Sequence, residues 1–200
     1  MRRTYHLIIL LVRFYMKLIW NLKIINKERL NKNYLQNCII AANHISWNDP
    51  PFISSILPIE INFLAKYELF QNKFFAGIIT YLNAIPIKRG RIDRSALRTV
   101  QKRLLSGNSL LIFPEGTRRG KKAKAGIGLV AYRTKKDIIP IHIKNSDSFK
   151  ECIFRKKNLQ ITIGEKIKIA DYLDLGDNKK TFRTIANLTL KRINKLDENN

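Results

Sequence analysis

Short apolar segments recur along this chain, and segments with helical spacing separate most of them. Apolar segments of strand length occupy residues 37–42, 61–66, 84–88, 109–113, 138–144 and 159–167. Helical spacing covers residues 50–57, 68–82, 93–105, 125–134 and 178–196. Strands that alternate with helices predict an α/β fold in which helices flank a mostly parallel central sheet. Pro86 places the strand at 84–88 on an edge or in irregular pairing, because proline cannot donate to a sheet ladder.

The composition is that of one globular domain. A chain of 200 residues buries roughly 70% of its surface on folding, which is enough for a sizeable core. The apolar fraction of 45% excludes a disordered chain, and a total of two cysteines, Cys38 and Cys152, excludes a disulfide scaffold. No uninterrupted apolar run reaches the roughly 18 residues of a membrane span, which excludes a polytopic membrane protein.

The charge balance predicts an anionic partner. Lys and Arg number 38 against 15 Asp and Glu, which gives a formal net charge of +23. Nucleic acid and acidic phospholipid surfaces both attract such a chain, and composition does not choose between them. A solvated basic surface without a particular partner is a third interpretation.

The N-terminal segment favours a membrane surface. Residues 7–20 are apolar except for Arg13 and Lys17. At about 100° per residue, the polar side chains share one narrow stripe of a helix: Arg2, His6, Arg13 and Lys17. Such a helix can lie in the bilayer interface, with its cations at the headgroups and with Tyr15 and Trp20 at the same level.

Three other interpretations fit the residues of this segment less well. A signal peptide needs a small-residue cleavage site, which does not follow, and a spanning helix would hold Arg13 near the middle of the membrane at a high energetic cost. An ordinary core helix usually needs a narrower apolar arc. We therefore expect a membrane-associating helical segment at residues 1–30 and an α/β domain at residues 31–200.

A histidine and an aspartate lie just beyond the first predicted strand. His44 follows the strand at 37–42, at the edge where open α/β sheets bind ligands. Asp49 fits a helix N-cap, with Pro50 at the first helical position, and a turn can bring its carboxylate to the imidazole. The pair suits general-base activation of a substrate hydroxyl. The alternatives without catalysis are that Asp49 only caps the helix and that His44 is an ordinary loop histidine.

Covalent and metal chemistry are disfavoured by the residues present. Ser46 lacks the sharp G-x-S-x-G turn of a nucleophile elbow, and Cys38 lies in a strand without a charged neighbour to activate it. No second set of residues has metal-ligand spacing. We therefore expect no metal and no organic cofactor.

Two motifs give the chain a family resemblance. The sequence N-H-x4-D at residues 43–49 is followed by F-P-E-G-T-R at residues 113–118. Two weaker blocks, A-I-P-I-K-R at residues 84–89 and I-I-P-I at residues 138–141, fall in the expected order. Together these motifs resemble the glycerolipid acyltransferase family, specifically the 1-acyl-sn-glycerol-3-phosphate acyltransferases, over about residues 38–145.

The resemblance implies an O-acyltransferase of phospholipid biosynthesis. His44 would be the general base, oriented by Asp49, that takes the proton from the sn-2 hydroxyl of 1-acyl-glycerol-3-phosphate. The hydroxyl oxygen would attack an acyl thioester of coenzyme A or acyl carrier protein and give phosphatidate. The substrate-binding candidates are Arg89, Glu115, Gly116, Thr117, Arg118 and Lys124.

The residue types of the second motif suit phosphate binding. A guanidinium such as that of Arg118 matches phosphate geometry, and Gly116 lets the backbone turn tightly beside a ligand. Glu115 is expected to brace an arginine or a substrate hydroxyl. The few cysteines fit a cytoplasmic-facing domain, so we expect the protein at the cytoplasmic face of the inner (plasma) membrane.

Three rival functions stay open at this point. Related acyltransferases use other lysolipids, including lyso-ornithine lipids. A nucleic-acid-binding protein fits the charge, but the aromatic residues lie mostly in apolar runs rather than among basic stripes, so no nucleic-acid partner is expected. A catalytically idle membrane-binding module is disfavoured because His44, Asp49, Glu115 and Arg118 are all present.

Overall fold

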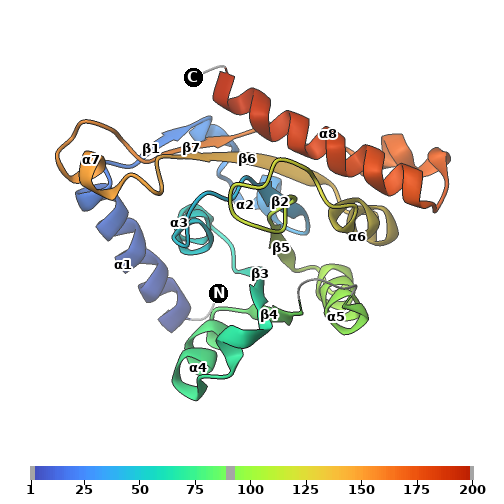
Figure 1. Ribbon diagram of the computed structural model, residues 1–200, viewed down its shortest axis with the longest axis horizontal. Helices are drawn as coiled ribbons and strands as arrows, with labels where there is room; N and C mark the ends of the chain where they lie inside the picture. Colours follow the sequence, from blue (N-terminus) through green and yellow to red (C-terminus); the bar gives the residue numbers. More distant parts are fainter. Residues whose placement is uncertain (1–2, 89–92, 199–200) are drawn as a thin grey trace.

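A central sheet lies between two layers of helices in the computed structural model, which describes residues 3–88 and 93–198 (Figure 1). The strands are β1 Lys23–Ile25, β2 Ile39–Ala42, β3 Ile61–Lys66, β4 Ala84–Ile87, β5 Ser109–Ile112, β6 Ile138–Lys144 and β7 Gln160–Ile163. The α-helices are α1 Arg3–Ile19, α2 Lys32–Leu35, α3 Asp49–Ile56, α4 Lys73–Tyr81, α5 Arg94–Leu105, α6 Gly126–Thr134, α7 Phe149–Ile153 and α8 Lys179–Glu198. Short 3-10 helices are η1 Lys27–Arg29, η2 Tyr67–Phe70 and η3 Ile169–Leu175.

The sheet is mostly parallel, as the sequence predicts. Its strand order is β1-β7-β6-β2-β5-β3-β4, and among these neighbours only β6 and β7 run antiparallel. Strand β4, which contains Pro86, lies at one edge, so the expected edge position is confirmed. Because β2 runs parallel to both β5 and β6, the carboxyl ends of these three strands lie side by side at one end of the sheet, and His44 follows β2 there.

Some elements differ from the sequence-based expectation. The helix expected over 68–82 is two elements, η2 and α4, because the Asn72 side chain accepts a hydrogen bond from the Phe75 N–H at 3.0 Å and starts a new helix. The sequence does not predict strand β1, because three residues are too few to show an alternation of apolar and polar side chains. It pairs with β7, so the segment at residues 1–30 contributes a strand to the main sheet. The division at residue 30 stays a prediction.

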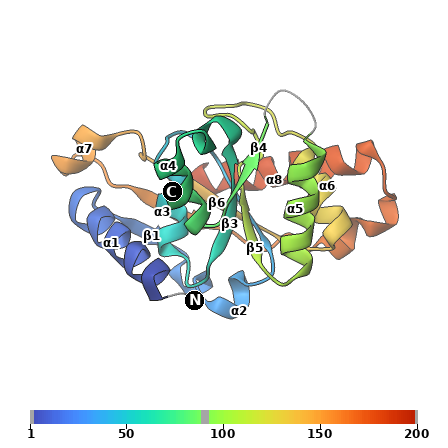
Figure 2. The same cartoon turned by 90° about the horizontal axis from the view of Figure 1, so that it is seen from below.

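Alternate residues of β2 face the two helical layers. Ile40 and Ala42 pack with α1 and α3, whereas Ile39 and Ala41 pack with α5, α6 and α8. Helices α1 and α8 consequently lie on opposite faces of the sheet (Figure 2).

Helix α1 packs on α3 in a way that corrects two details of the sequence interpretation. Arg13 donates from Nε to the Ser55 carbonyl at 2.9 Å, so its charge is held against α3. Trp20 is 2% exposed and lies in the core against Phe52, so it is not an interfacial anchor. His6 and Lys17 are exposed, and Arg2 of the predicted stripe lies outside the described residues.

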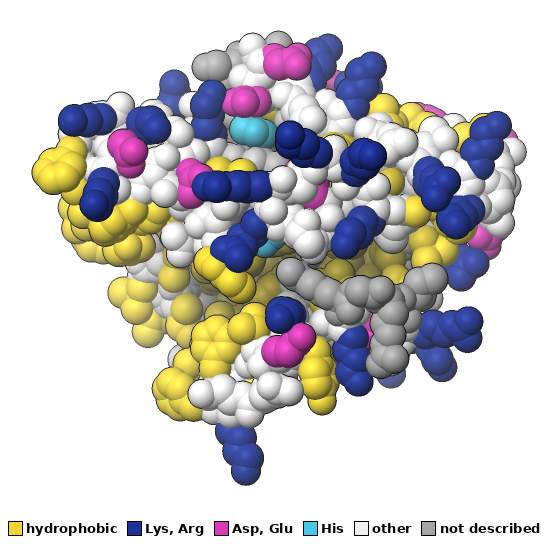
Figure 3. All heavy atoms as spheres, in the orientation of Figure 1, with side chains coloured by type: hydrophobic (Ala, Val, Ile, Leu, Met, Phe, Trp, Pro, Cys, Tyr) yellow, Lys and Arg dark blue, Asp and Glu magenta, His cyan; other side chains and the backbone are white. Residues whose placement is uncertain are grey.

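The side of α1 that faces away from the core is apolar and exposed. It presents Leu7, Leu10, Leu11, Phe14, Tyr15 and Leu18. Exposed apolar side chains of α7 and α4 add Phe149, Ile153, Phe74, Phe75 and Ile78. Figure 3 shows apolar side chains gathered at the lower left, over α1, α4 and α7, while basic side chains dominate the upper and right-hand parts. None of the helices over the described ranges has the length and apolar character needed to cross a bilayer.

Candidate active site

His44 and Asp49 form a buried pair at the carboxyl end of β2. The Nδ1 of His44 lies 2.8 Å from Oδ2 of Asp49, and the two residues are 7% and 0% exposed. A neutral imidazole whose Nδ1–H donates to the carboxylate keeps the lone pair of Nε2 free. The predicted meeting of these two side chains is confirmed, and the geometry suits a general base.

Both oxygens of the Asp49 carboxylate accept hydrogen bonds. Its Oδ2 also accepts from the backbone N–H groups of Ile45 at 2.7 Å and Ser46 at 2.8 Å, and its Oδ1 accepts from the hydroxyl of Ser146. The expected N-cap role is wrong by one residue, because Asn48 is the N-cap and α3 begins at Asp49. The carboxylate turns back toward the preceding loop instead of capping the helix.

Ser146 is a site residue that the sequence interpretation missed. It is 0% exposed and lies just after β6, the strand next to β2. Its position beyond a neighbouring strand end is the one signal that could have found it. Asn43 was likewise unassigned. Its amide bonds both the N–H and the carbonyl of Ile143 at 2.8 Å, which ties the start of the His44 loop to β6.

The segment after β5 wraps around His44. Phe113 stacks on the imidazole with ring centroids 4.2 Å apart, and the backbone N–H of Arg119 donates to the His44 carbonyl at 2.6 Å. Glu115 accepts a hydrogen bond from the His44 backbone N–H at 3.1 Å, and the expected brace to an arginine or a substrate hydroxyl stays a prediction. Burial raises the pKa of Glu115 to about 7; the nearby charge of Asp49 adds to this effect, and the hydrogen bond from His44 opposes it.

Four of the other substrate-binding candidates lie in or beside this segment: Gly116, Thr117, Arg118 and Lys124. Gly116 has a φ of +69°, and a side chain there would come within 2.9 Å of Lys124. Thr117 and Arg118 are exposed, and the guanidinium of Arg118 lies 3.9 Å from the ring centroid of Trp47. Arg89 lies outside the described residues.

An apolar cavity of about 300 Å³ adjoins His44. Helices α1, α3 and α4 and strand β3 supply its walls, with Tyr5, Ile8, Ile9, Val12, Trp47, Pro50, Phe63, Leu64, Phe75, Ile78, Ile79 and Phe113 among the lining residues. Lys66, at the end of β3, adds a cation to this lining that the sequence interpretation did not single out. A cavity of this size and character can hold part of an acyl chain.

The other nucleophile candidates are engaged or inactive. Burial raises the pKa of Cys38 to about 12, which keeps the thiol protonated. The hydroxyl of Ser46 accepts a hydrogen bond from the Asn48 backbone N–H at 3.2 Å within the loop. The site geometry therefore favours direct attack by a substrate hydroxyl that His44 activates.

The comparisons with known proteins agree with this geometry. The 1-acyl-sn-glycerol-3-phosphate acyltransferase of Bacillus subtilis (strain 168) is 32% identical over 88% of this chain and 90% of that protein. The 1-acyl-sn-glycerol-3-phosphate acyltransferase of Streptococcus pneumoniae is also 32% identical, over 83% of this chain and 62% of its own length. The crystal structure of a 1-acyl-sn-glycerophosphate acyltransferase from Thermotoga maritima matches with a TM-score of 0.71 at 22% identity, covering 97% of this chain and 78% of that one, so the two share a fold.

The family model named Acyltransferase matches residues 21–144, which include β2, the His44 loop, β5 and β6. This match spans more than half of the 200 residues and contains both motifs on which the resemblance depends. The chain belongs to the Acyltransferase family.

Proposed function

We propose that this protein transfers a fatty acyl group from an acyl thioester to the sn-2 hydroxyl of 1-acyl-glycerol-3-phosphate and so makes phosphatidate. The observation that carries the proposal is the buried pair of His44 and Asp49, with Nδ1 held at 2.8 Å from the carboxylate beside an apolar cavity. The curated relatives named above are 1-acyl-sn-glycerol-3-phosphate acyltransferases, which supports this choice of acceptor.

The proposed reaction is one acyl transfer without a covalent enzyme intermediate. Nε2 of His44 takes the proton of the acceptor hydroxyl as the oxygen attacks the thioester carbonyl. The new C–O bond forms, the tetrahedral intermediate collapses, and the C–S bond breaks. The departing sulfur takes the proton back from His44, while Asp49 stabilises the imidazolium in between.

The remaining candidates would hold the two ends of the acceptor. Arg89, Gly116, Thr117, Arg118 and Lys124 would bind the phosphate, with Trp47 keeping Arg118 in place through its ring face. Glu115 would fix the peptide group of His44. The apolar cavity would take an acyl chain, which needs no hydrogen bonds from its walls.

The exposed apolar side of α1, together with α4 and α7, would enter the surface of an anionic membrane. This arrangement corresponds to an interfacial helix rather than a spanning one. Because the cavity is also lined by α1 and α4, a lysolipid could pass from the bilayer toward His44 without crossing water. We place the protein at the cytoplasmic face of the inner (plasma) membrane.

The test is product identification in mixed micelles. Purified protein would receive lysophosphatidate or lyso-ornithine lipid as acceptor, and acyl-coenzyme A or acyl carrier protein thioester as donor, with mass spectrometry of the products. We expect phosphatidate that depends on His44. Product from lyso-ornithine lipid alone would overturn the proposed acceptor, and no product from any combination would overturn the proposed reaction.

A further inference from the structure

An unpartnered hydroxyl lies in the wall of the apolar cavity beside His44. Ser54 of α3 lines this cavity and is 6% exposed, and its Oγ has no hydrogen-bond partner among the residues that the structure describes. Two other buried side-chain atoms share this condition, Nε1 of Trp20 and Nε2 of Gln160, but neither residue lines the cavity. A buried hydroxyl that makes no hydrogen bond is unfavourable, so its presence at this position calls for an explanation.

Buried hydroxyls at three other helix positions bond to their own helix. The Ser55 hydroxyl donates to the Phe52 carbonyl at 2.8 Å, and the hydroxyls of Thr134 and Thr189 donate to carbonyls four residues earlier at 2.7 and 2.8 Å. Ser54 lies on the same helix as Ser55 and makes no such bond within the described part of the chain. Its hydroxyl is therefore available to donate to a molecule that enters the cavity.

The position of Ser54 decides which part of a substrate it can reach. Pro50 and Ser54 both line the cavity, four residues apart on one side of α3. The helix rises about 6 Å between them at 1.5 Å per residue. Since α3 begins at Asp49, which faces His44, Ser54 lies about one helical turn farther along the cavity wall than the His44 end.

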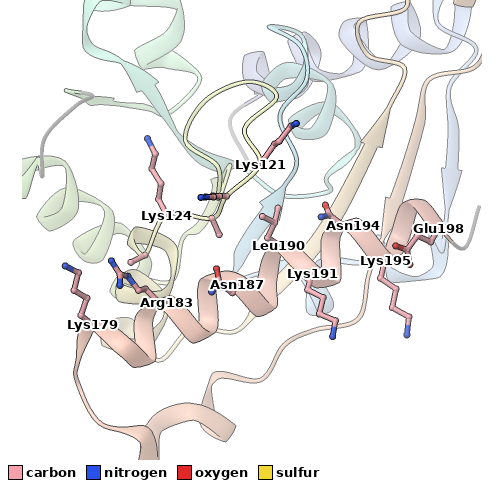
Figure 4. Close-up of a pocket in the computed structure, with 13 residues that line it drawn as sticks. Lys121, Lys124, Lys179, Arg183, Asn187, Leu190, Lys191, Asn194, Lys195 and Glu198 are labelled. Carbon is pink, nitrogen blue, oxygen red and sulfur yellow. The ribbon is translucent and has the colours of Figure 1, made fainter.

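The cavity at His44 is also the space that suits an acyl chain. A larger space, of about 830 Å³, is a groove between the loop at residues 121–125 and α8 (Figure 4). Cations of the loop and the helix dominate its lining, as the labelled Lys124, Arg183 and Lys191 show. An acyl chain in this groove would cover these charges and separate them from water at a cost, so the chain belongs in the apolar cavity.

The lipid whose chain we place in the cavity is the acceptor. Helices α1 and α4 line the cavity, and both also present exposed apolar side chains, which the proposed function assigns to the membrane surface. A lysolipid that arrives from this surface keeps its chain in apolar surroundings along the whole route. The head of that chain then lies beside His44 and α3.

An ester carbonyl is the group that Ser54 can recognise on this chain. A fatty chain is apolar apart from its ester, whose carbonyl oxygen accepts a hydrogen bond, as the hydroxyl requires. Only a few bonds separate the sn-1 ester of 1-acyl-glycerol-3-phosphate from the sn-2 hydroxyl. With the sn-2 hydroxyl at Nε2 of His44, the sn-1 ester is at a distance comparable with the one helical turn between the His44 end and Ser54.

We propose that the Ser54 hydroxyl donates to the sn-1 ester carbonyl of the acceptor and gives the enzyme a preference for 1-acyl over 1-O-alkyl lysophosphatidate. An ether-linked acceptor has no carbonyl at this position and leaves the buried hydroxyl unpaired. This inference rests on the proposed function and names the class of acceptor, ester-linked lysolipids, for the same site. Ser54 is then a substrate-binding residue that touches no reacting atom.

The test compares two acceptors that differ only in this carbonyl, 1-oleoyl-glycerol-3-phosphate and its 1-O-oleyl ether analogue, in mixed micelles of equal composition. We expect the wild-type kcat/KM for the ester to exceed that for the ether by roughly three- to tenfold, the size of one hydrogen bond. Ser54→Ala should lower the ester value to the ether value and leave the ether value unchanged. A wild type without preference, a variant that keeps the preference, or an equal fall with both acceptors would overturn the proposal.

The matched control is Ser55→Ala, the same substitution one residue farther along α3. Its hydroxyl bonds to Phe52 inside the protein, so this variant should keep the preference for the ester and unfold at a lower temperature than wild type. Ser54→Ala removes an unpartnered polar atom and should unfold no earlier than wild type. Loss of the preference in both variants, or a lower unfolding temperature for Ser54→Ala, would overturn the proposal.

Infrared spectroscopy of the bound acceptor separates failure of this inference from failure of the proposed reaction. Lysophosphatidate with an isotope-labelled sn-1 carbonyl would be bound without any acyl donor. A hydrogen bond lowers the carbonyl stretching frequency, so the frequency should be lower in wild type than in Ser54→Ala. If this shift is present while no phosphatidate forms, the role of Ser54 in binding stands and the proposed reaction fails. Equal frequencies in the two proteins, as expected if the donor's chain fills the cavity instead, overturn the role of Ser54 whatever the turnover.

Discussion

The hydroxyl of Ser146 donates to Oδ1 of Asp49, while Oδ2 of the same carboxylate faces Nδ1 of His44. In the proposed mechanism, Ser146 is therefore a positioning residue that acts on the general base through Asp49. Strand β6 supplies it and strand β2 supplies the histidine, so the pairing of these two strands sets the geometry of the site.

Removal of the Ser146 hydroxyl should weaken both the fold and the reaction. We expect Ser146→Ala to lower the free energy of unfolding by about 1–3 kcal/mol, because a buried carboxylate loses a donor. The value of kcat should fall, and Ser146→Thr should restore part of it. In an Asp49→Asn background the effect of Ser146→Ala on kcat should shrink, since the two residues act together. Equal effects in the two backgrounds would contradict a positioning role.

Glu115 should make stability depend on pH. Its ordinary pKa of 4.5 is raised to about 7 in the folded protein, chiefly by burial. The folded state therefore holds a proton that the unfolded chain has already lost, and the stability linked to it declines as the pH rises from about 4.5 to 7. Relative to Glu115→Gln, wild type should lose unfolding free energy between about pH 4.5 and pH 7 in urea titrations. A difference in unfolding free energy between the two proteins that stays constant over this pH range would contradict the raised pKa of Glu115.

Trp47 should influence acceptor binding through Arg118. The guanidinium lies 3.9 Å from the centroid of the indole ring at an exposed position, where such contacts contribute about 0.5–1 kcal/mol. We expect Trp47→Ala to raise KM for lysophosphatidate by about two- to fivefold with a smaller change in kcat. The same substitution in an Arg118→Ala protein should change KM less, and an undiminished effect there would show that Trp47 acts by another route.

The exposed side of α1 should carry the membrane affinity. Deletion of α1 would be a poor test, because Met16 packs in the core. Leu11→Glu with Phe14→Glu leaves that core intact and should weaken binding to anionic vesicles by at least about 100-fold, since burial of each side chain contributes about 1.5–3 kcal/mol.

Its control is Leu105→Glu with Leu175→Glu. These two residues are similarly exposed, at 66% and 52%, but lie on α5 and η3. Vesicle co-sedimentation should leave this control at the wild-type level. Equal losses in the two double variants would mean that any added negative charge weakens binding and that α1 has no special part in it.

Local patterns in the sequence predicted much of the fold and the centre of the site. Alternating strands and helices predicted the mostly parallel sheet, and the five-residue separation of His44 and Asp49 allowed one turn to join them. Contacts between segments that lie far apart in the sequence produce no local pattern from which they can be predicted. Ser146 is 97 positions from Asp49, and Arg13 is 42 positions from the Ser55 carbonyl that it bonds. The pairing of β2 with β6 brings Ser146 to Asp49, and the packing of α1 on α3 brings Arg13 to Ser55.

The most direct test of the proposed chemistry is the turnover of His44→Ala with lysophosphatidate and each acyl donor. We expect kcat to fall by about 100- to 10,000-fold, the usual contribution of a general base, while the protein stays folded with an unfolding free energy lowered by about 1–3 kcal/mol, because buried Asp49 loses a donor. Turnover near the wild-type value in a folded His44→Ala protein would remove His44 from the reaction and contradict the mechanism.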